Sequence, residues 1–170
     1  MWSSNQKIAM SKSEKKNLKL MGKNQEDLKV ISAYSQDCIV AIKDIVFLQK
    51  NKIFVMLVNR FMWEDVEKGP FRTNKRIRCA IRFEEVLTAR SKNINQKDKN
   101  RYLECLAIKS DKIVNNNYEI NFFFSGDGVI TLVVEAIEVI MHDLGDSWSV
   151  KYIPKHKIWV LIYLIILNRT

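Results

Sequence analysis

Two-residue alternation of apolar and basic side chains is the feature that most limits how this chain can fold. In KRIRCAIRF, residues 75–83, every second position is apolar: Ile77, Cys79, Ile81 and Phe83. Successive side chains of a β-strand point to opposite faces of its sheet. The stretch therefore predicts a strand with one buried face and one basic face.

Further β-rich runs lie on both sides of this strand. CIVAIK, DIVFLQ and KIFVMLVNRF precede it, and RYLECLAIKS, YEINFFF and VITLVVE follow it. Polar turn signals such as QKNK and SGDG separate neighbouring runs, which indicates antiparallel pairing. We expect seven or eight mostly antiparallel strands in one curved sheet.

Two helices are expected to flank the strand series. Asn24 is a suitable N-cap for the first helix, with Glu26 and Asp27 in the first turn. The second is predicted over AIEVIMHDLG, residues 136–145, with Gly145 just past its end. The fold class is therefore α+β, as a sandwich or a partly open barrel like the pleckstrin-homology fold.

The length of 170 residues, 47% of them hydrophobic, fits a single domain with a sizeable core. We expect residues 1–17 to be a disordered basic tail, 18–157 the domain and 158–170 an apolar extension. Ten helical residues, Ile158 to Leu167, would reach about 15 Å, half of a hydrocarbon core of about 30 Å, so the extension cannot span a membrane. Three cysteines without a C-x-x-C pair and no leader-like segment indicate a cytoplasmic protein.

The net charge of +9 is unevenly distributed along the chain. Residues 68–92 carry eight Lys or Arg against two Glu, whereas residues 113–147 carry six Asp or Glu and neither Lys nor Arg. A polarised charge distribution favours encounter with an anionic partner. Most of the basic residues are lysines, which an A/T-rich genome can supply without selection for binding, so the arginines are more informative.

The polar face of the strand at 75–83 carries three arginines, Arg76, Arg78 and Arg82. If the strand at 53–61 is adjacent, Arg60 would extend this row into a site for phosphate or carboxylate, which guanidinium groups bind through two parallel hydrogen bonds. The alternative is a solvated sheet face on which acidic residues pair with the arginines. Nucleic acid is disfavoured because Phe83 faces the apolar side and Trp63 lies beyond the neighbouring strand.

The stretch VISAYSQDC, residues 30–38, carries residue types that are common in catalytic sites. Helical spacing places Ser32 and Gln36 on one face and Cys38 on another, so no local nucleophile cluster forms. Asp37 is predicted either to accept turn amides or to contact a ligand. An enzyme would need Asp37, Arg60 and Glu64 to converge on one pocket.

Neither a metal nor a cofactor is expected. Glu135, Glu138 and His142 would share one face of the second predicted helix and could hold a metal. The same residues equally suit the polar face of an amphipathic helix. We therefore assign no catalytic or metal-binding residue.

The order of several blocks resembles a known family. LKL, EDLKVISAYSQDCIV, LVNRFMWE, RIRCAIRFEEVL, GVITLVVEAIEVIMHDLGDSW and PKH follow one another from Leu18 to His156. Together they are similar to the alphaproteobacterial domain of unknown function 2948 family. The chain departs from that pattern at Tyr34, where a histidine is expected, and at Cys38, where an alanine is expected. The resemblance implies a bacterial cytoplasmic protein and brings no activity, cofactor or catalytic residue with it.

The primary hypothesis is a non-enzymatic binding or adaptor module. Its arginine-lined face, with Arg60, Arg76, Arg78 and Arg82, would bind an anionic ligand or an acidic protein. An enzyme with a pocket near Asp37, Arg60 and Glu64 is the alternative, and a weak nucleic-acid binder is the third hypothesis.

Overall fold

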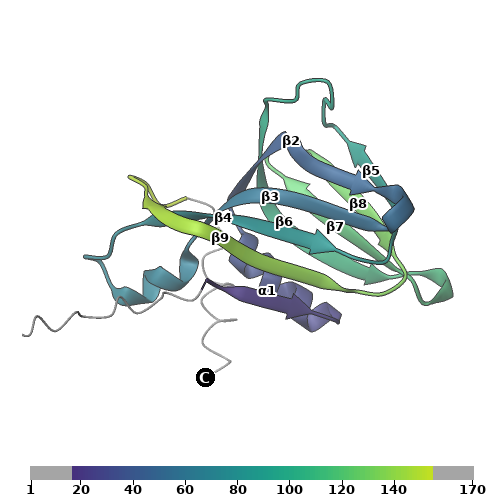
Figure 1. Cartoon of the computed structure of the whole chain (residues 1–170), viewed down its shortest axis with the longest axis horizontal. Coiled ribbons are helices and arrows are strands. Elements are labelled where there is room, and N and C mark those ends of the chain that lie inside the picture. The colour runs from purple at the N-terminus through teal and green to yellow at the C-terminus, as the bar shows by residue number, and fades with distance from the viewer. Residues whose placement is uncertain (1–16, 155–170) are drawn as a thin grey trace, which may run out of the picture.

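The computed structural model describes residues 17–154 as one antiparallel sheet with an α-helix packed against it (Figure 1). The strands are β1 (Lys19–Gly22), β2 (Cys38–Leu48), β3 (Ile53–Phe61), β4 (Lys75–Phe83), β5 (Val86–Lys92), β6 (Tyr102–Lys112), β7 (Tyr118–Phe124), β8 (Val129–Val134) and β9 (Val139–Ser149). The helices are α1 (Gln25–Ser35) and the short 3₁₀ segments η1 (Gln49–Asn51), η2 (Trp63–Lys68) and η3 (Val114–Asn116). The predicted extension at 158–170 and all but the last residue of the predicted tail at 1–17 lie outside the described residues.

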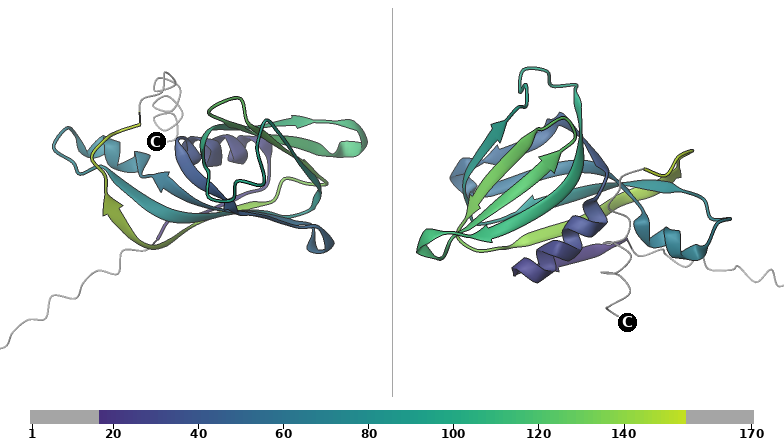
Figure 2. Two further views of the ribbon diagram at one scale, coloured as in Figure 1. Left: turned by 90° about the horizontal axis from the view of Figure 1, so that it is seen from above. Right: turned by 180° about the vertical axis from the view of Figure 1, so that it is seen from behind.

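Nine strands, rather than the expected seven or eight, form an open sheet in the order β1-β9-β4-β3-β2-β6-β7-β8-β5, and the predicted antiparallel architecture is confirmed. The sheet curls so that β6, β7 and β8 lie across from β2, β3 and β4 (Figure 2). Phe122 of β7 meets Phe54 of β3 at 5.8 Å and Phe83 of β4 at 5.4 Å between ring centroids, so the core fills the space between the two halves. The specific likeness to a pleckstrin-homology barrel stays a prediction.

The N-terminal helix is confirmed, including its cap. The Asn24 side chain accepts a hydrogen bond from the Asp27 amide at 2.8 Å, which satisfies one of the unpaired donors of the first turn. Leu28 and Ile31 then enter the core. Gly22 precedes the helix at a close approach, where an added Cβ would lie 2.8 Å from Val139 Cγ1.

The second predicted helix is wrong, because residues 139–149 form strand β9 between β1 and β4. Val139, Met141 and Asp143 are buried while His142 and Leu144 are exposed, so the true period is two. Gly145 has φ 68, but it lies in an irregularity of the β4–β9 pairing rather than at a helix end.

The loss of this helix also removes the metal hypothesis that depended on it. Glu135 and Glu138 precede β9 and His142 lies within it, so helical spacing no longer brings them together. Among residues 17–154, no cluster of three His, Cys, Asp or Glu side chains could hold a metal ion.

Candidate functional site

The five strands β1, β9, β4, β3 and β2 present a broad surface away from the core, which we call the outer face. Pairing aligns one row across all five strands: Met21, Ile140, Arg82, Val55 and Val46. The next rows along the strands contain Lys19, His142, Ala80 and Leu57, and then Leu144, Arg78, Asn59 and Ile39. The outer face therefore alternates arginines with aliphatic side chains.

Much of the apolar surface on the outer face is open. Met21 is 60% exposed, Val46 45% and Leu144 37%. Helix α1 does not cover them, because its apolar residues Leu28 and Ile31 pack into the core on the opposite side. The outward face of an antiparallel sheet is usually polar where it meets water. This face is instead aliphatic at most of its central positions, which is typical of an interaction surface.

The predicted arginine row exists, but its head groups already have partners. Arg78 donates to Asp44 Oδ2 at 3.0 Å and to Asn59 Oδ1 at 3.2 Å, and Arg82 pairs with Glu84 at 2.8 Å. These contacts follow the alternative in which acidic residues pair with the arginines. Arg82 is the most accessible of the three, with 45% of its side chain exposed.

Arg76 lies where the outer face meets the turn between α1 and β2. Its guanidinium donates to the backbone oxygens of Asp37 and Asn59, both at 3.0 Å, and stacks on the Phe61 ring at 5.9 Å from the centroid. Burial lowers the pKa of Arg76, and the nearby Cys38 and Asp37 oppose this shift. Arg76 therefore ties the turn to β3 and β4.

The prediction that Arg60 extends the arginine row is wrong. Arg60 pairs with Ile77 across β3 and β4, so its side chain shares the inner face with Met56 and Val58 and is fully buried. Its Nε and Nη2 donate to the two oxygens of Asp143 at 2.7 and 2.6 Å. The residue was assigned to the wrong side because β3 is apolar on both faces, so its sequence does not reveal which face is buried.

Glu64 of η2 completes the partners of Arg60. Its two carboxylate oxygens accept from Nη1 and Nη2 at 3.0 and 2.7 Å, and the Tyr34 ring lies 5.7 Å from the guanidinium carbon. Burial acts to lower the pKa of Arg60, but the hydrogen bonds from Arg60 to Asp143 and Glu64 outweigh it and raise the pKa above its ordinary value. The cluster is a permanently charged clamp that joins β3, η2 and β9.

The residues of the enzyme hypothesis do not share one pocket. Asp37 lies beside Arg76 at the turn, whereas Arg60 and Glu64 meet Asp143 on the inner face. Glu64 and Asp143 border a hollow of about 550 Å³, yet Arg60 occupies the oxygens of both. Neither carboxylate is therefore placed to act as a general base without losing this pairing.

Asp37 is almost fully buried and adopts a left-handed backbone conformation, with φ 60. Its amide donates to Cys105 O at 2.8 Å, which fixes the turn against β6. Its charge interacts with that of Arg76, and the acceptance of turn amides by its carboxylate stays a prediction. Asp37 therefore belongs with the turn that Arg76 anchors.

The cysteines are buried free thiols, as predicted. A hydrogen bond with Cys105, followed by burial, raises the pKa of Cys38. Burial and the neighbouring Asp143 raise the pKa of Cys79. Burial and a raised pKa both disfavour the thiolate form at neutral pH, so neither thiol has the environment of an activated nucleophile.

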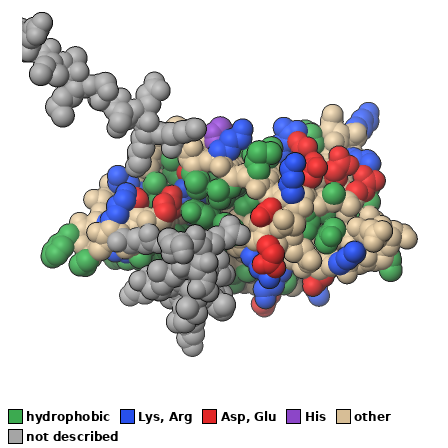
Figure 3. All heavy atoms as spheres, turned by 90° about the horizontal axis from the view of Figure 1, so that it is seen from below, with side chains coloured by type: hydrophobic (Ala, Val, Ile, Leu, Met, Phe, Trp, Pro, Cys, Tyr) green, Lys and Arg blue, Asp and Glu red, His purple; other side chains and the backbone are tan. Residues whose placement is uncertain are grey.

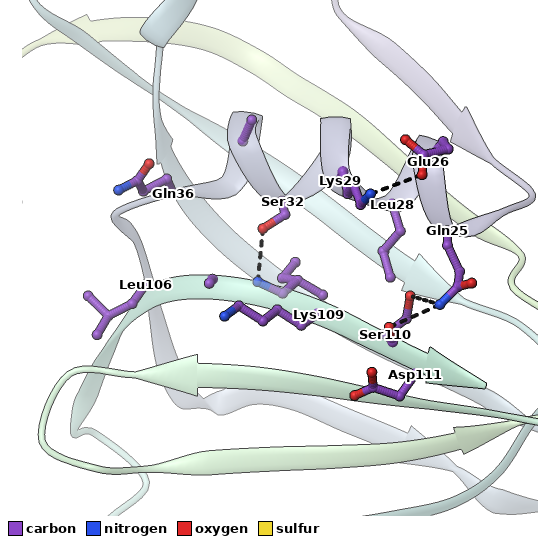
Figure 4. Close-up of a pocket in the computed structure, with 13 residues that line it drawn as sticks. Gln25, Glu26, Leu28, Lys29, Ser32, Gln36, Leu106, Lys109, Ser110 and Asp111 are labelled. Atoms are coloured by element: carbon purple, nitrogen blue, oxygen red, sulfur yellow. Dashed lines mark hydrogen bonds and ion pairs between the residues drawn. The ribbon is translucent and has the colours of Figure 1, made fainter. Parts of the chain in front are cut away.

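A groove of about 590 Å³ between α1 and β6 was not predicted (Figure 4). Beyond Cys105, strand β6 pairs with β7 on one side, and its other edge faces α1. Ser32 Oγ accepts from the Ile108 amide at 2.9 Å, and the Gln25 side chain donates to Ser110 O at 3.0 Å. The polar face of α1, which the sequence did identify at Ser32 and Gln36, thus covers a sheet edge that would otherwise be open to other strands.

Acidic and basic side chains are interspersed over the face seen in Figure 3, which is the side on which β1 and α1 lie in Figure 1. The ion pair between Lys29 and Glu26 of α1, at 2.9 Å, is one such contact. In the part of the chain that the structure describes, no helix is both long and apolar enough to cross a bilayer.

Comparison with known proteins identifies a family but no characterised relative. Neither the curated proteins nor the solved structures contain a match to this chain. The model of a family described as a protein of unknown function, DUF2948, matches residues 18–156. That span contains every described strand, α1, the outer face and the Arg60 clamp. The chain therefore belongs to the DUF2948 family of proteins of unknown function.

Proposed function

We propose that this protein is a non-enzymatic binding module that docks an acidic, amphipathic protein segment on its outer face. The observation that carries the proposal is the aliphatic row through Met21, Ile140, Val55 and Val46 on the outer face, in which Met21 and Val46 are exposed and Ile140 and Val55 are partly buried. Burying such side chains against a partner contributes roughly 25 cal/mol for each Å² of apolar surface removed from water.

The charge of the molecule indicates the chemistry of the partner. Arg82 stands within the aliphatic row, and Lys19 is exposed at one end of the next row. The chain as a whole carries a net charge of +9, so two copies packed face to face would bring their arginine rows together. An acidic segment with apolar side chains complements both the charge and the aliphatic surface, whereas a second copy complements only the latter.

The other two hypotheses have less geometric support. Catalysis would need convergent acid–base groups, and Arg60 already holds Glu64 and Asp143. For nucleic acid, Trp148 pairs with Arg76 across the sheet and is 41% exposed, but the other exposed aromatics, Phe71, Tyr102 and Tyr152, lie outside the five strands of the outer face and do not extend a stacking surface along it. Neither catalysis nor nucleic-acid binding gives a role to the aliphatic side chains of the outer face, whereas docking of a protein segment does.

The test compares two triple variants that each replace two apolar residues and one arginine. V46S/L144S/R82Q alters the outer face, and V114S/F71S/R101Q removes two exposed apolar groups and one arginine elsewhere. Each protein is immobilised and exposed to a lysate of its host cell, and an acidic protein that it captures is purified. Isothermal calorimetry at low and high salt then measures the affinity of this captured protein for the wild type and for both triple variants. We expect the wild type and the control triple to bind the captured protein with an affinity that falls as the salt concentration rises. The outer-face triple should bind it with an affinity lower by roughly tenfold or more.

Equal binding by all three proteins would refute the docking surface. Sedimentation of the free protein addresses the second-copy occupant: a dimer that the outer-face triple dissociates would show that the partner is another copy of the chain. Fluorescence anisotropy with a labelled single-stranded oligonucleotide addresses nucleic acid, and tight binding that only the outer-face triple loses would overturn the choice of an acidic protein.

A further inference from the structure

One end of the molecule is formed by the connection that leads into β4 and by the last part of β9. We call this end, residues 69–76 and 146–154, the aromatic end. Val150 N donates to Asn74 O at 2.8 Å, so the first segment runs beside the second. Figures 1 and 2 show both segments at the same end of the sheet. The β4–β9 pairing, which continues from here into the sheet, therefore fixes their position.

The aromatic end carries three accessible aromatic side chains. Phe71 is fully exposed, Tyr152 is 72% exposed and Trp148 is 41% exposed. Hydrophobic side chains protrude at this end, at the left of Figure 3. The backbone amide and Nη1 of Arg72 both donate to Gly69 O, at 3.3 and 2.9 Å, so hydrogen bonds close the turn that presents Phe71. Large apolar groups gathered in exposed positions indicate contact with another surface.

The charge of the aromatic end is mainly basic. Its two segments contain four basic residues, Arg72, Lys75, Arg76 and Lys151, and one acidic residue, Asp146. Lys151 Nζ lies 5.3 Å from the centroid of the Tyr152 ring, so a cation stands beside an exposed aromatic ring. In the adjacent η2, Asp65 is already paired with Lys68 at 2.6 Å. The aromatic end therefore combines exposed aromatic rings with an excess of positive charge.

An anionic membrane surface complements this combination. Aromatic side chains favour the headgroup level of a bilayer, and lysine and arginine are attracted to anionic lipids. The sequence also continues from Pro154 with Lys155 and Lys157, and then with the uncharged residues 158–167. Ten residues are too few to cross a hydrocarbon core of about 30 Å, but they add further apolar side chains next to this end in the sequence.

We propose that the aromatic end binds to the surface of an anionic lipid bilayer. The exposed aromatic side chains enter the interface between headgroups and acyl chains, and the basic side chains contact lipid phosphates. Binding is peripheral and reversible, because few apolar side chains take part. The aliphatic row of the outer face is not used, so this proposal and the docking of an acidic protein segment stand or fail separately.

The test is sedimentation of the full-length protein with sucrose-loaded vesicles. Vesicles of equal parts phosphatidylglycerol and phosphatidylcholine supply the anionic surface, and vesicles of phosphatidylcholine alone are the neutral comparison. We expect binding to the anionic vesicles that weakens as the salt concentration rises, and binding to the neutral vesicles that is weaker by roughly tenfold or more. No sedimentation with the anionic vesicles above that of the protein alone would overturn the proposal.

Two double variants of unchanged net charge test the aromatic side chains. F71S/Y152S removes two exposed rings from the aromatic end, and Y102S/V114S removes two exposed apolar side chains at the start of β6 and in η3. Because all four side chains are exposed, both variants should keep the circular dichroism spectrum of the wild type. We expect roughly tenfold weaker binding to anionic vesicles in the first and unchanged binding in the second. Equal binding by both would refute the assigned surface.

Two further double variants test the location of the charge. K75Q/K151Q removes two lysines from the aromatic end, and K97Q/K112Q removes two lysines elsewhere. Charges that do not approach the bilayer are screened over a Debye length of about 10 Å. We expect roughly tenfold weaker binding in the first variant and little change in the second. Equal weakening in both would show an effect of net charge alone and contradict the proposal.

A labelled single-stranded oligonucleotide distinguishes a membrane from nucleic acid, which also combines negative charge with affinity for aromatic rings. We expect it to leave the protein on the anionic vesicles when it is added in excess. Displacement of the protein by the oligonucleotide, with loss of oligonucleotide binding in F71S/Y152S, would assign the aromatic end to nucleic acid and overturn the choice of a lipid surface.

Discussion

Arg60→Met should strongly destabilise the protein, because it leaves a buried carboxylate without its cation. Methionine keeps most of the aliphatic length of arginine, so the main loss is the charge and its hydrogen bonds. Asp143 is only 3% exposed and accepts two of these bonds, whereas Glu64 is 31% exposed and can be hydrated. Breaking one partner of a buried ion pair typically costs about 3–5 kcal/mol. We assign most of that cost to Asp143.

A double-mutant cycle isolates the buried charge from other effects of the substitution. Asp143→Asn should also destabilise, because it leaves the guanidinium with one charged partner. In the R60M/D143N double variant no unpaired charge remains on either residue, so the combined loss should be smaller than the sum of the single losses by about 2 kcal/mol or more. Glu64→Gln serves as the control, since its partial exposure should limit its cost to about 1 kcal/mol.

Urea unfolding followed by tryptophan fluorescence and by circular dichroism measures these differences, provided that both probes give the same transition. An Arg60→Met loss below about 1 kcal/mol would refute the role assigned to the clamp. Strict additivity of the two single losses would show that Arg60 and Asp143 do not stabilise the fold as a pair.

Three further predictions concern the helix, the thiols and the C-terminal boundary. Ser32→Ala should cost about 1–2 kcal/mol in urea unfolding, because the Ile108 amide loses its acceptor, while Ser149→Ala at the exposed end of β9 should be nearly silent. Cys38 and Cys79 should not react with a thiol reagent at neutral pH until the protein unfolds, because both are buried and have raised pKa values; reaction at the rate of a free thiol would contradict this. A chain cut after Lys157 should keep its circular dichroism spectrum, since the family match ends at residue 156; loss of structure would show that the apolar extension is integral.

Local signals in the sequence were sufficient for most of the strands and for α1. The alternation in 75–83 correctly placed Arg76, Arg78 and Arg82 on one face, because period two is a property of any extended chain. Asn24 correctly marked the start of α1, because the cap depends only on residues within one turn. The groove between α1 and β6 could not be predicted, because it depends on the residue of β6 at which the pairing with β2 ends, Cys105.

The two errors at the site have a common origin. In residues 136–145, Ile137, Ile140, Met141 and Leu144 fit a helical stripe, while the strand reading requires Asp143 to be a buried position. A buried aspartate is improbable unless a cation meets it, and the cation is Arg60, 83 residues away in the chain. In the same way, β3 is apolar on both faces, and its own sequence does not show the carboxylate that meets Arg60 on the buried face. Each residue makes the buried position of the other possible, so neither could be placed from its own segment. Only the pairing of β3, β4 and β9 brings the two charges together, and this pairing also leaves the outer face with its aliphatic row.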